Sequence, residues 1–157
     1  MSRINLKKFL SEEGMTAISA AVKEAESRTS GEIKVLVVQS SINPGDKITH
    51  EEAANTRAEK EFMNLGIQQT EGHTGVLIMV SLDERQVVVK ADKAIDEKVE
   101  AGTWDFVVTN IIDGIKRNVP AEGICAAVRW VGQYLAQYFP IQEDDRNELS
   151  DGVELRE

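Results

Sequence analysis

The chain has 157 residues, of which 41% are hydrophobic and 29% are charged, and its formal net charge is -9. This length suits one domain with a full hydrophobic core and is short for two ordinary domains. The excess of acid excludes a general attraction to nucleic-acid phosphates or anionic lipids. The sequence has no uninterrupted apolar run of roughly 20 residues, so we expect no membrane insertion.

Two further features favour a cytoplasmic protein. The basic residues near the N-terminus are not followed by an apolar run of signal-peptide length. Cys125 is the single cysteine, and it cannot form a disulfide within the chain. We therefore expect a cytoplasmic location, with Cys125 as a buried, unreactive thiol in an apolar helical run.

The first half of the chain predicts a strand between two helices. Ser11 can cap a helix that carries a regular apolar face. The segment 32–38, EIKVLVV, is largely apolar and β-branched, which predicts an interior strand buried on both faces. Thr49 and Glu52 have the spacing of a capping box, and Gly66 marks the end of the helix that follows them.

The middle of the chain predicts a hairpin. Residues 75–82, GVLIMVSL, form the next predicted strand, and it should lie parallel to 32–38 because a helix connects the two. Only 83–85 separate it from the apolar run at 86–91, so that run must return antiparallel.

The remaining predicted elements are helices. A short helix is expected at 94–99, a second begins with Thr103 as its cap, and a third begins at Pro120 and ends before Pro140. Helices thus precede, separate and follow the strands. We predict a three-layer α/β/α sandwich around a small mixed sheet, made of a parallel strand–helix–strand unit plus an antiparallel hairpin strand.

The C-terminal residues differ from the rest in composition. Residues 141–157 hold seven acidic side chains against two arginines and contain few apolar residues. We therefore expect one domain over 1–140, followed by an acidic C-terminal tail over 141–157 that is solvated or loosely docked. Such a tail is also a candidate site for a protein partner.

Several segments resemble a known family when they are taken together. They are RTSGEIKVLVV, FMNLGIQQTEGHTGVLIMVSLDERQVVVKADKAI, a tryptophan at position 104 and FPIQEDDRNELSDGV. Over nearly the whole chain they resemble the TPM domain, most closely its short bacterial stand-alone members without a membrane anchor. The resemblance implies an α/β/α domain, the divalent cation binding of some relatives and the acid phosphatase activity reported for plant relatives.

The chain departs from the family pattern at one turn. Family members often have Gly-Asp-x-Gly-Ile after the third strand, whereas this chain has Ala91-Asp92-Lys93-Ala94-Ile95. Without the two glycines the backbone approaches a ligand less closely, which argues against a phosphate-binding turn here.

The predicted topology sorts the acidic candidates into two groups. Ligands of open α/β sheets bind beyond the carboxyl ends of parallel strands, where Ser40, Asp83 and Glu84 fall. Since Ca²⁺ and Mg²⁺ prefer oxygen ligands, we predict a metal site at these residues, with Glu32 and Asp92 at the opposite end as a second candidate cluster. The alternatives are that Asp83 and Glu84 are ordinary turn residues and that Asp92 caps a helix.

Two functions are compatible with these patterns. The sequence contains no phosphate-binding loop, dinucleotide fingerprint or nucleophile elbow, so no catalytic residue is assigned. We favour a divalent-cation-binding interaction module that meets a protein partner through its acidic tail or a sheet edge. The alternative is a metal-dependent acid phosphatase, in which bound Ca²⁺ or Mg²⁺ polarises a phosphoryl oxygen.

Overall fold

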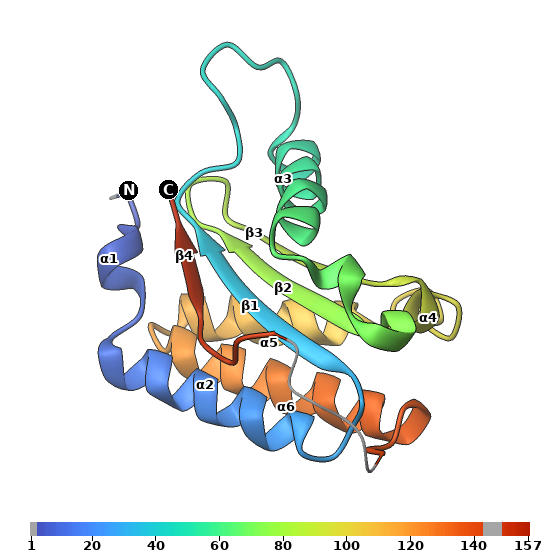
Figure 1. Ribbon diagram of the computed structural model, residues 1–157. Coiled ribbons are helices and arrows are strands. Elements are labelled where there is room, and N and C mark those ends of the chain that lie inside the picture. The colour runs from blue at the N-terminus through green and yellow to red at the C-terminus, as the bar shows by residue number, and fades with distance from the viewer. Residues whose placement is uncertain (1–2, 143–148) are drawn as a thin grey trace.

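The computed structural model describes residues 3–142 and 149–157. Four acidic residues of the predicted tail, Glu143, Asp144, Asp145 and Glu148, lie outside the described residues. In the part that is described, one mixed sheet has the strand order β3-β2-β1-β4 (Figure 1). The strands are β1 (Glu32–Val38), β2 (Gly75–Ser81), β3 (Gln86–Ala91) and β4 (Glu154–Arg156).

The strand directions confirm the predicted strand–helix–strand unit and the predicted hairpin. Strand β1 pairs in parallel with β2, from Glu32 opposite Gly75 to Val38 opposite Ser81. Strand β3 pairs antiparallel with β2. All seven residues of β1 are buried, as expected of an interior strand with helices on both faces.

The helices follow the predicted order, with one addition at the N-terminus. They are α1 (Leu6–Phe9), α2 (Glu12–Glu26), α3 (His50–Asn64), α4 (Lys93–Asp96), α5 (Asp105–Lys116) and α6 (Pro120–Tyr138), and two short 3-10 turns (Ile67–Gln69 and Glu71–His73) precede β2. The Ser11 and Thr49 side chains cap α2 and α3 as predicted. The prediction that Thr103 caps α5 is wrong, because Trp104 precedes that helix and no side chain caps it.

Helices cover both faces of the sheet, which confirms the α/β/α sandwich (Figure 1). Helix α3 packs Ala54, Ala58 and Phe62 on one face, against Leu36 of β1. Helices α2, α5 and α6 pack on the other face and form the larger core. Each face of β1 is thus buried by a different helical layer.

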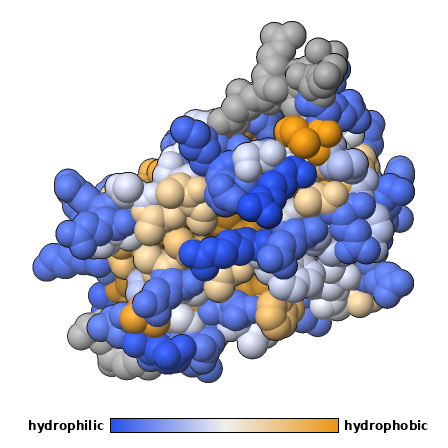
Figure 2. All heavy atoms as spheres, turned by 90° about the horizontal axis from the view of Figure 1, so that it is seen from below, coloured by the Kyte–Doolittle hydropathy of each residue, from blue (hydrophilic) through white to orange (hydrophobic). Residues whose placement is uncertain are grey.

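Helices α2 and α6 approach each other closely through small residues. A Cβ added at Gly132 would lie only 2.5 Å from the Ala25 Cβ, so glycine is required for this packing. Seen from below (Figure 2), the helical face shows charged side chains around a paler, weakly apolar strip. Alanines of both helices line a shallow groove here, with Arg28 and Arg129 beside it.

Of the two arrangements expected for the tail, solvated or loosely docked, the solvated one is wrong for residues 149–157. Strand β4 pairs in parallel with β1 over Leu36–Val38 and extends the sheet. The ammonium of Lys34, which is only 3% exposed, donates to the carbonyls of Ser150 and Gly152 at 3.1 and 3.0 Å. Main-chain pairing with β1 and the hydrogen bonds to the buried Lys34 ammonium hold 149–157 in place, although the segment has few apolar residues.

No helix within 3–142 and 149–157 has the length and apolar character that a membrane crossing requires.

Candidate functional site

Glu84 lies in the hairpin turn between β2 and β3 and is buried. Its carboxylate accepts hydrogen bonds from the Ser81 hydroxyl at 2.6 Å, the Ser41 N–H at 2.7 Å and the Ser40 hydroxyl at 2.9 Å. Burial alone raises the pKa of Glu84, but the hydrogen bonds from Ser81, Ser41 and Ser40 outweigh it and lower the pKa below its usual value. Glu84 is therefore ionised and joins the turn to the segment after β1.

Asp83 is held from two directions. Arg3 donates to both of its oxygens, at 3.0 and 2.9 Å, and the Gln39 amide donates at 2.8 Å. The hydrogen bond from Arg3 is the largest cause of the lowered pKa of Asp83. Gln39 also accepts the Leu6 N–H, so this group ties the N-terminal segment to the end of β1.

The structure brings Ser40, Asp83 and Glu84 together at one end of the sheet, beyond the carboxyl ends of β1 and β2, as their sequence positions indicate. In this arrangement the carboxylate oxygens of Asp83 and Glu84 accept hydrogen bonds from protein donors, among them the Ser40 hydroxyl. Among the described residues, no three His, Cys, Asp or Glu side chains form a group that could hold a metal ion. A metal role for Ser40, Asp83 and Glu84 stays a prediction.

The residues of the second cluster each bond to a different segment. Glu32 accepts the Leu149 N–H at 2.9 Å and so helps to hold the C-terminal segment. Asp92 accepts the Lys93 N–H as the cap of α4 and pairs with the His73 imidazole at 3.2 Å. The capping alternative for Asp92 is confirmed.

Glu26 is an unusual carboxyl group that the sequence analysis missed. It lies at the end of α2 and accepts the Ile33 N–H at 2.7 Å. Burial, followed by a hydrogen bond with Asp151, raises its pKa to about 9. No local pattern marks Glu26, because its partner lies near the other end of the chain.

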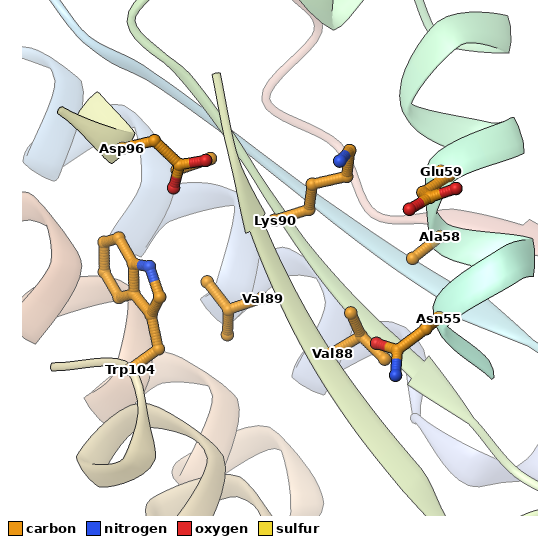
Figure 3. Close-up of a pocket in the computed structure, with 9 residues that line it drawn as sticks. Asn55, Ala58, Glu59, Val88, Val89, Lys90, Asp96 and Trp104 are labelled. Carbon is orange, nitrogen blue, oxygen red and sulfur yellow. The ribbon is translucent and has the colours of Figure 1, made fainter. Parts of the chain in front are cut away.

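A groove runs along β3 on the side away from β2 (Figure 3). It is lined by Asn55, Ala58 and Glu59 of α3, by the residues from Val88 to Ala91, by Asp96 of α4 and by Trp104. Figure 3 shows the α3 residues on one side of β3, and Asp96 and Trp104 on the other. The groove encloses about 240 Å³, less than a typical small-molecule pocket of roughly 300 to 1,000 Å³ and enough for a few peptide side chains.

The floor of this groove carries backbone groups that the sheet does not use. Asp92 donates its N–H to the Gly75 carbonyl, so Asp92 and Gly75 form a hydrogen-bonded antiparallel pair. Because such pairs alternate along a ladder, the N–H and C=O groups of Val87, Val89 and Ala91 point away from β2. Strand β3 is terminal in the sheet, and no loop or cap hydrogen bond of the described chain reaches these three residues.

The rim of the groove is acidic. Glu59 and Asp96 are exposed on opposite sides of β3, and neither forms an ion pair with another residue described by the structure. The one lysine of the strand, Lys90, places its ammonium 5.4 Å from the centre of the Phe62 ring. A sheet edge is one of the partner surfaces expected from the sequence, but no sequence pattern shows which edge is open or which charges flank it.

Comparison with known proteins identifies a family and a common fold. The family model of the TPM domain matches residues 4–134. The BA42 protein of the psychrophilic bacterium Bizionia argentinensis, solved by NMR, is 30% identical with a TM-score of 0.80, over 96% of this chain and 98% of that one. The N-terminal domain of a protein from P. gingivalis is 17% identical with a TM-score of 0.60, over 90% and 83% of the two chains, and shows a shared fold alone. No curated protein matches the chain.

Proposed function

The chain belongs to the TPM domain family, and we propose that it is a non-catalytic interaction module that takes an extended segment of a partner onto the edge of β3. The observation that carries the proposal is the set of outward N–H and C=O groups at Val87, Val89 and Ala91. An unpaired strand edge is a template for pairing with another chain. Several peptide-binding domains use such an edge, where main-chain bonds supply affinity and flanking pockets supply specificity.

The side chains around β3 suit this mode of binding. Val87 and Val89 pack toward the larger core, and Val88 packs toward α3, so the edge is fixed by both helical layers. A rigid edge lowers the entropy that is lost when a segment is added. The groove beside it has room for side chains of the added strand on both faces of the sheet.

The opposite edge of the sheet supplies a precedent within the molecule. There the segment Glu154–Arg156 adds to β1 although it contains one apolar residue, Leu155, which is 38% exposed. Main-chain pairing together with a few polar contacts is sufficient for strand addition at that edge. The same mode at β3 requires no change in the fold.

A proline substitution tests the proposal. Val89→Pro removes an N–H that points outward and leaves the ladder to β2 intact, whereas Val89→Thr keeps that N–H and serves as the control. Both variants are titrated with extended peptides of about six residues, a common strand length, in which valine alternates with arginine, glutamine or glutamate. We expect shifts of β3 amide resonances in the wild type and in Val89→Thr, and none in Val89→Pro. If no peptide shifts β3, or if Val89→Pro binds normally, the proposal is wrong.

Divalent cation binding is the second candidate, and one contact favours it. The Glu26 and Asp151 carboxyls are hydrogen-bonded to each other, and such a pair would supply two oxygen ligands to a cation, with water supplying the others. A cation would compete for the proton of this pair. Titration with Ca²⁺ or Mg²⁺ should then shift resonances around Glu26 in the wild type and not in Glu26→Gln. Shifts around Ser40 and Glu84 instead would support the metal site predicted from the sequence.

The same titrated samples separate binding from catalysis. A metal-dependent phosphatase would hydrolyse a phenyl phosphate ester with added Mg²⁺ and stop when the ion is chelated. Cation shifts without turnover would support the module, and turnover abolished by chelation would support the enzyme.

A further inference from the structure

Resting on the proposed function, we infer that the segment bound by β3 is basic: an extended strand that carries lysine or arginine on both of its faces. The two carboxylates at the rim, Glu59 and Asp96, are the basis of this inference (Figure 3). Side chains of an added strand point alternately to the two faces of the sheet. One set would therefore face Glu59 on α3, and the other set would face Asp96 on α4.

The Asp96 side of the groove favours arginine in particular. Trp104 lines the groove on that side, as Figure 3 shows, so a cation that pairs with Asp96 lies near an indole ring. Trp104 is fixed by ring contacts with Trp130 and Tyr134, at centroid distances of 6.3 and 5.7 Å. A guanidinium stacks on aromatic rings and pairs with carboxylates, whereas an ammonium is more strongly hydrated.

The opposite edge of the sheet shows that charges beside an edge are paired with charges on the strand that it holds. There the buried ammonium of Lys34 pairs with Glu154 of β4 at 3.1 Å, and Glu61 of α3 pairs with Arg156 of β4 at 3.4 Å. Each of these two charges beside the β1 edge thus meets the opposite charge on the added strand. By the same rule, the carboxylates beside the β3 edge select a basic strand.

A second copy of this chain suits the β3 edge less well than a basic segment. Each copy carries a net charge of -9. Pairing of two β3 edges would also bring the Glu59 and Asp96 rims of both copies together. Like charges at an interface oppose association, and a basic segment removes that repulsion.

Three peptides test the inference. They are extended peptides of about six residues with valine at both ends and four arginines, four glutamines or four glutamates between them, so that the variable residue stands on both faces of the strand, and their affinities are measured from β3 amide shifts at low and at high salt. We expect the arginine peptide to bind at least about tenfold more tightly than the glutamine peptide at low salt, and the glutamate peptide more weakly than either. High salt should reduce the preference, because the rim carboxylates are exposed.

Neutralising variants locate the source of the preference. Glu59→Gln/Asp96→Asn should reduce the preference for arginine over glutamine to less than about threefold and leave binding of the glutamine peptide unchanged. Glu12→Gln/Glu122→Gln changes the net charge by the same amount on α2 and α6 and serves as the control, with the preference retained.

The outcomes separate this inference from the proposed function. Equal affinity for the arginine and glutamine peptides would overturn the basic partner and leave strand addition in place. Loss of preference in the control variant as well would mean a whole-molecule charge effect, which also overturns it. If no peptide shifts β3, the proposed function fails first. Concentration-dependent dimerisation through β3, measured by sedimentation, would make a second copy the occupant and contradict the inference.

Discussion

At the scale of single residues, Glu84 connects the β2–β3 turn to the segment that follows β1. Its carboxylate accepts three hydrogen bonds of 2.9 Å or less, from Ser81, Ser41 and Ser40. A buried donor that loses its acceptor is destabilising because it has also lost its contact with water. The arrangement explains why a charged residue occupies a turn position that is almost completely buried.

We therefore expect Glu84→Ala to lower the free energy of unfolding by about 2 to 3 kcal/mol. The pKa of Glu84 is lowered in the folded protein. Its contribution is thus fully present above the unfolded-state pKa, near 4.5, and is lost as the pH falls through the lower folded value. Urea unfolding at neutral and acidic pH measures both effects, with the exposed Glu97→Ala as control. A change below about 0.5 kcal/mol, typical of an ordinary surface position, would contradict this role.

Glu26 has the opposite linkage to pH. Its pKa rises from 4.5 to about 9 on folding, so the folded protein binds the proton more tightly than the unfolded chain. The stabilisation is fully present below pH 4.5 and is lost progressively as the pH rises to about 9. Glu26→Gln keeps a neutral side chain and should flatten the stability curve across this interval. Parallel curves for the variant and the wild type would show that Glu26 titrates normally.

At the scale of elements, the C-terminal strand β4 depends on polar contacts. Glu154 of β4 pairs with the buried ammonium of Lys34, and the segment just before β4 supplies the Ser150 and Gly152 carbonyls as its acceptors. Removing one partner of a buried charge is more destabilising than replacing both with apolar groups. The strand and the residues just before it therefore stabilise the domain although they include few apolar residues.

Deletion of residues 149–157 should lower the free energy of unfolding by about 3 kcal/mol or more in the wild type. The same deletion in a Lys34→Met background should have a smaller effect, because no buried ammonium is left without partners. Denaturant unfolding of the four proteins measures the coupling between Lys34 and the tail. Equal losses in the two backgrounds would indicate that Lys34 does not hold the tail.

The elements that could be predicted from the sequence are those with a strong local signal. Strand β1 has the predicted bounds, because its apolar, β-branched run is bordered by polar residues. The four-residue helix α1 and the three-residue strand β4 were missed, since neither is long enough to show a period. Pairing with β1 stabilises β4, and no pattern within ELR reveals that contact.

At the scale of the whole molecule, the two edges of the sheet differ in what they bind. The β1 edge is covered by the chain's own strand β4. The β3 edge retains outward backbone groups beside a groove with carboxylates on its rim. The net charge of -9 strengthens the preference of this edge for a basic partner.

The candidate site was only partly predictable for the same reason. Topology placed Ser40, Asp83 and Glu84 at the carboxyl end of β1 and β2. The donors to the Asp83 and Glu84 carboxylates include Arg3 and Ser81, whose positions depend on tertiary structure. The β3 groove combines side chains from α3, β3, α4 and the residue before α5. Such a surface has no signature in a single segment of sequence.

The most direct test of strand addition at β3 is amide hydrogen exchange measured by NMR, in the free protein and with the arginine–valine peptide. In the free protein, the amides of Val87, Val89 and Ala91 should exchange much faster than those of Val88 and Lys90, which bond to β2. Saturation with the peptide should slow the first three by at least about tenfold. Equal protection along β3 in the free protein, or unchanged rates at saturation, would contradict the account.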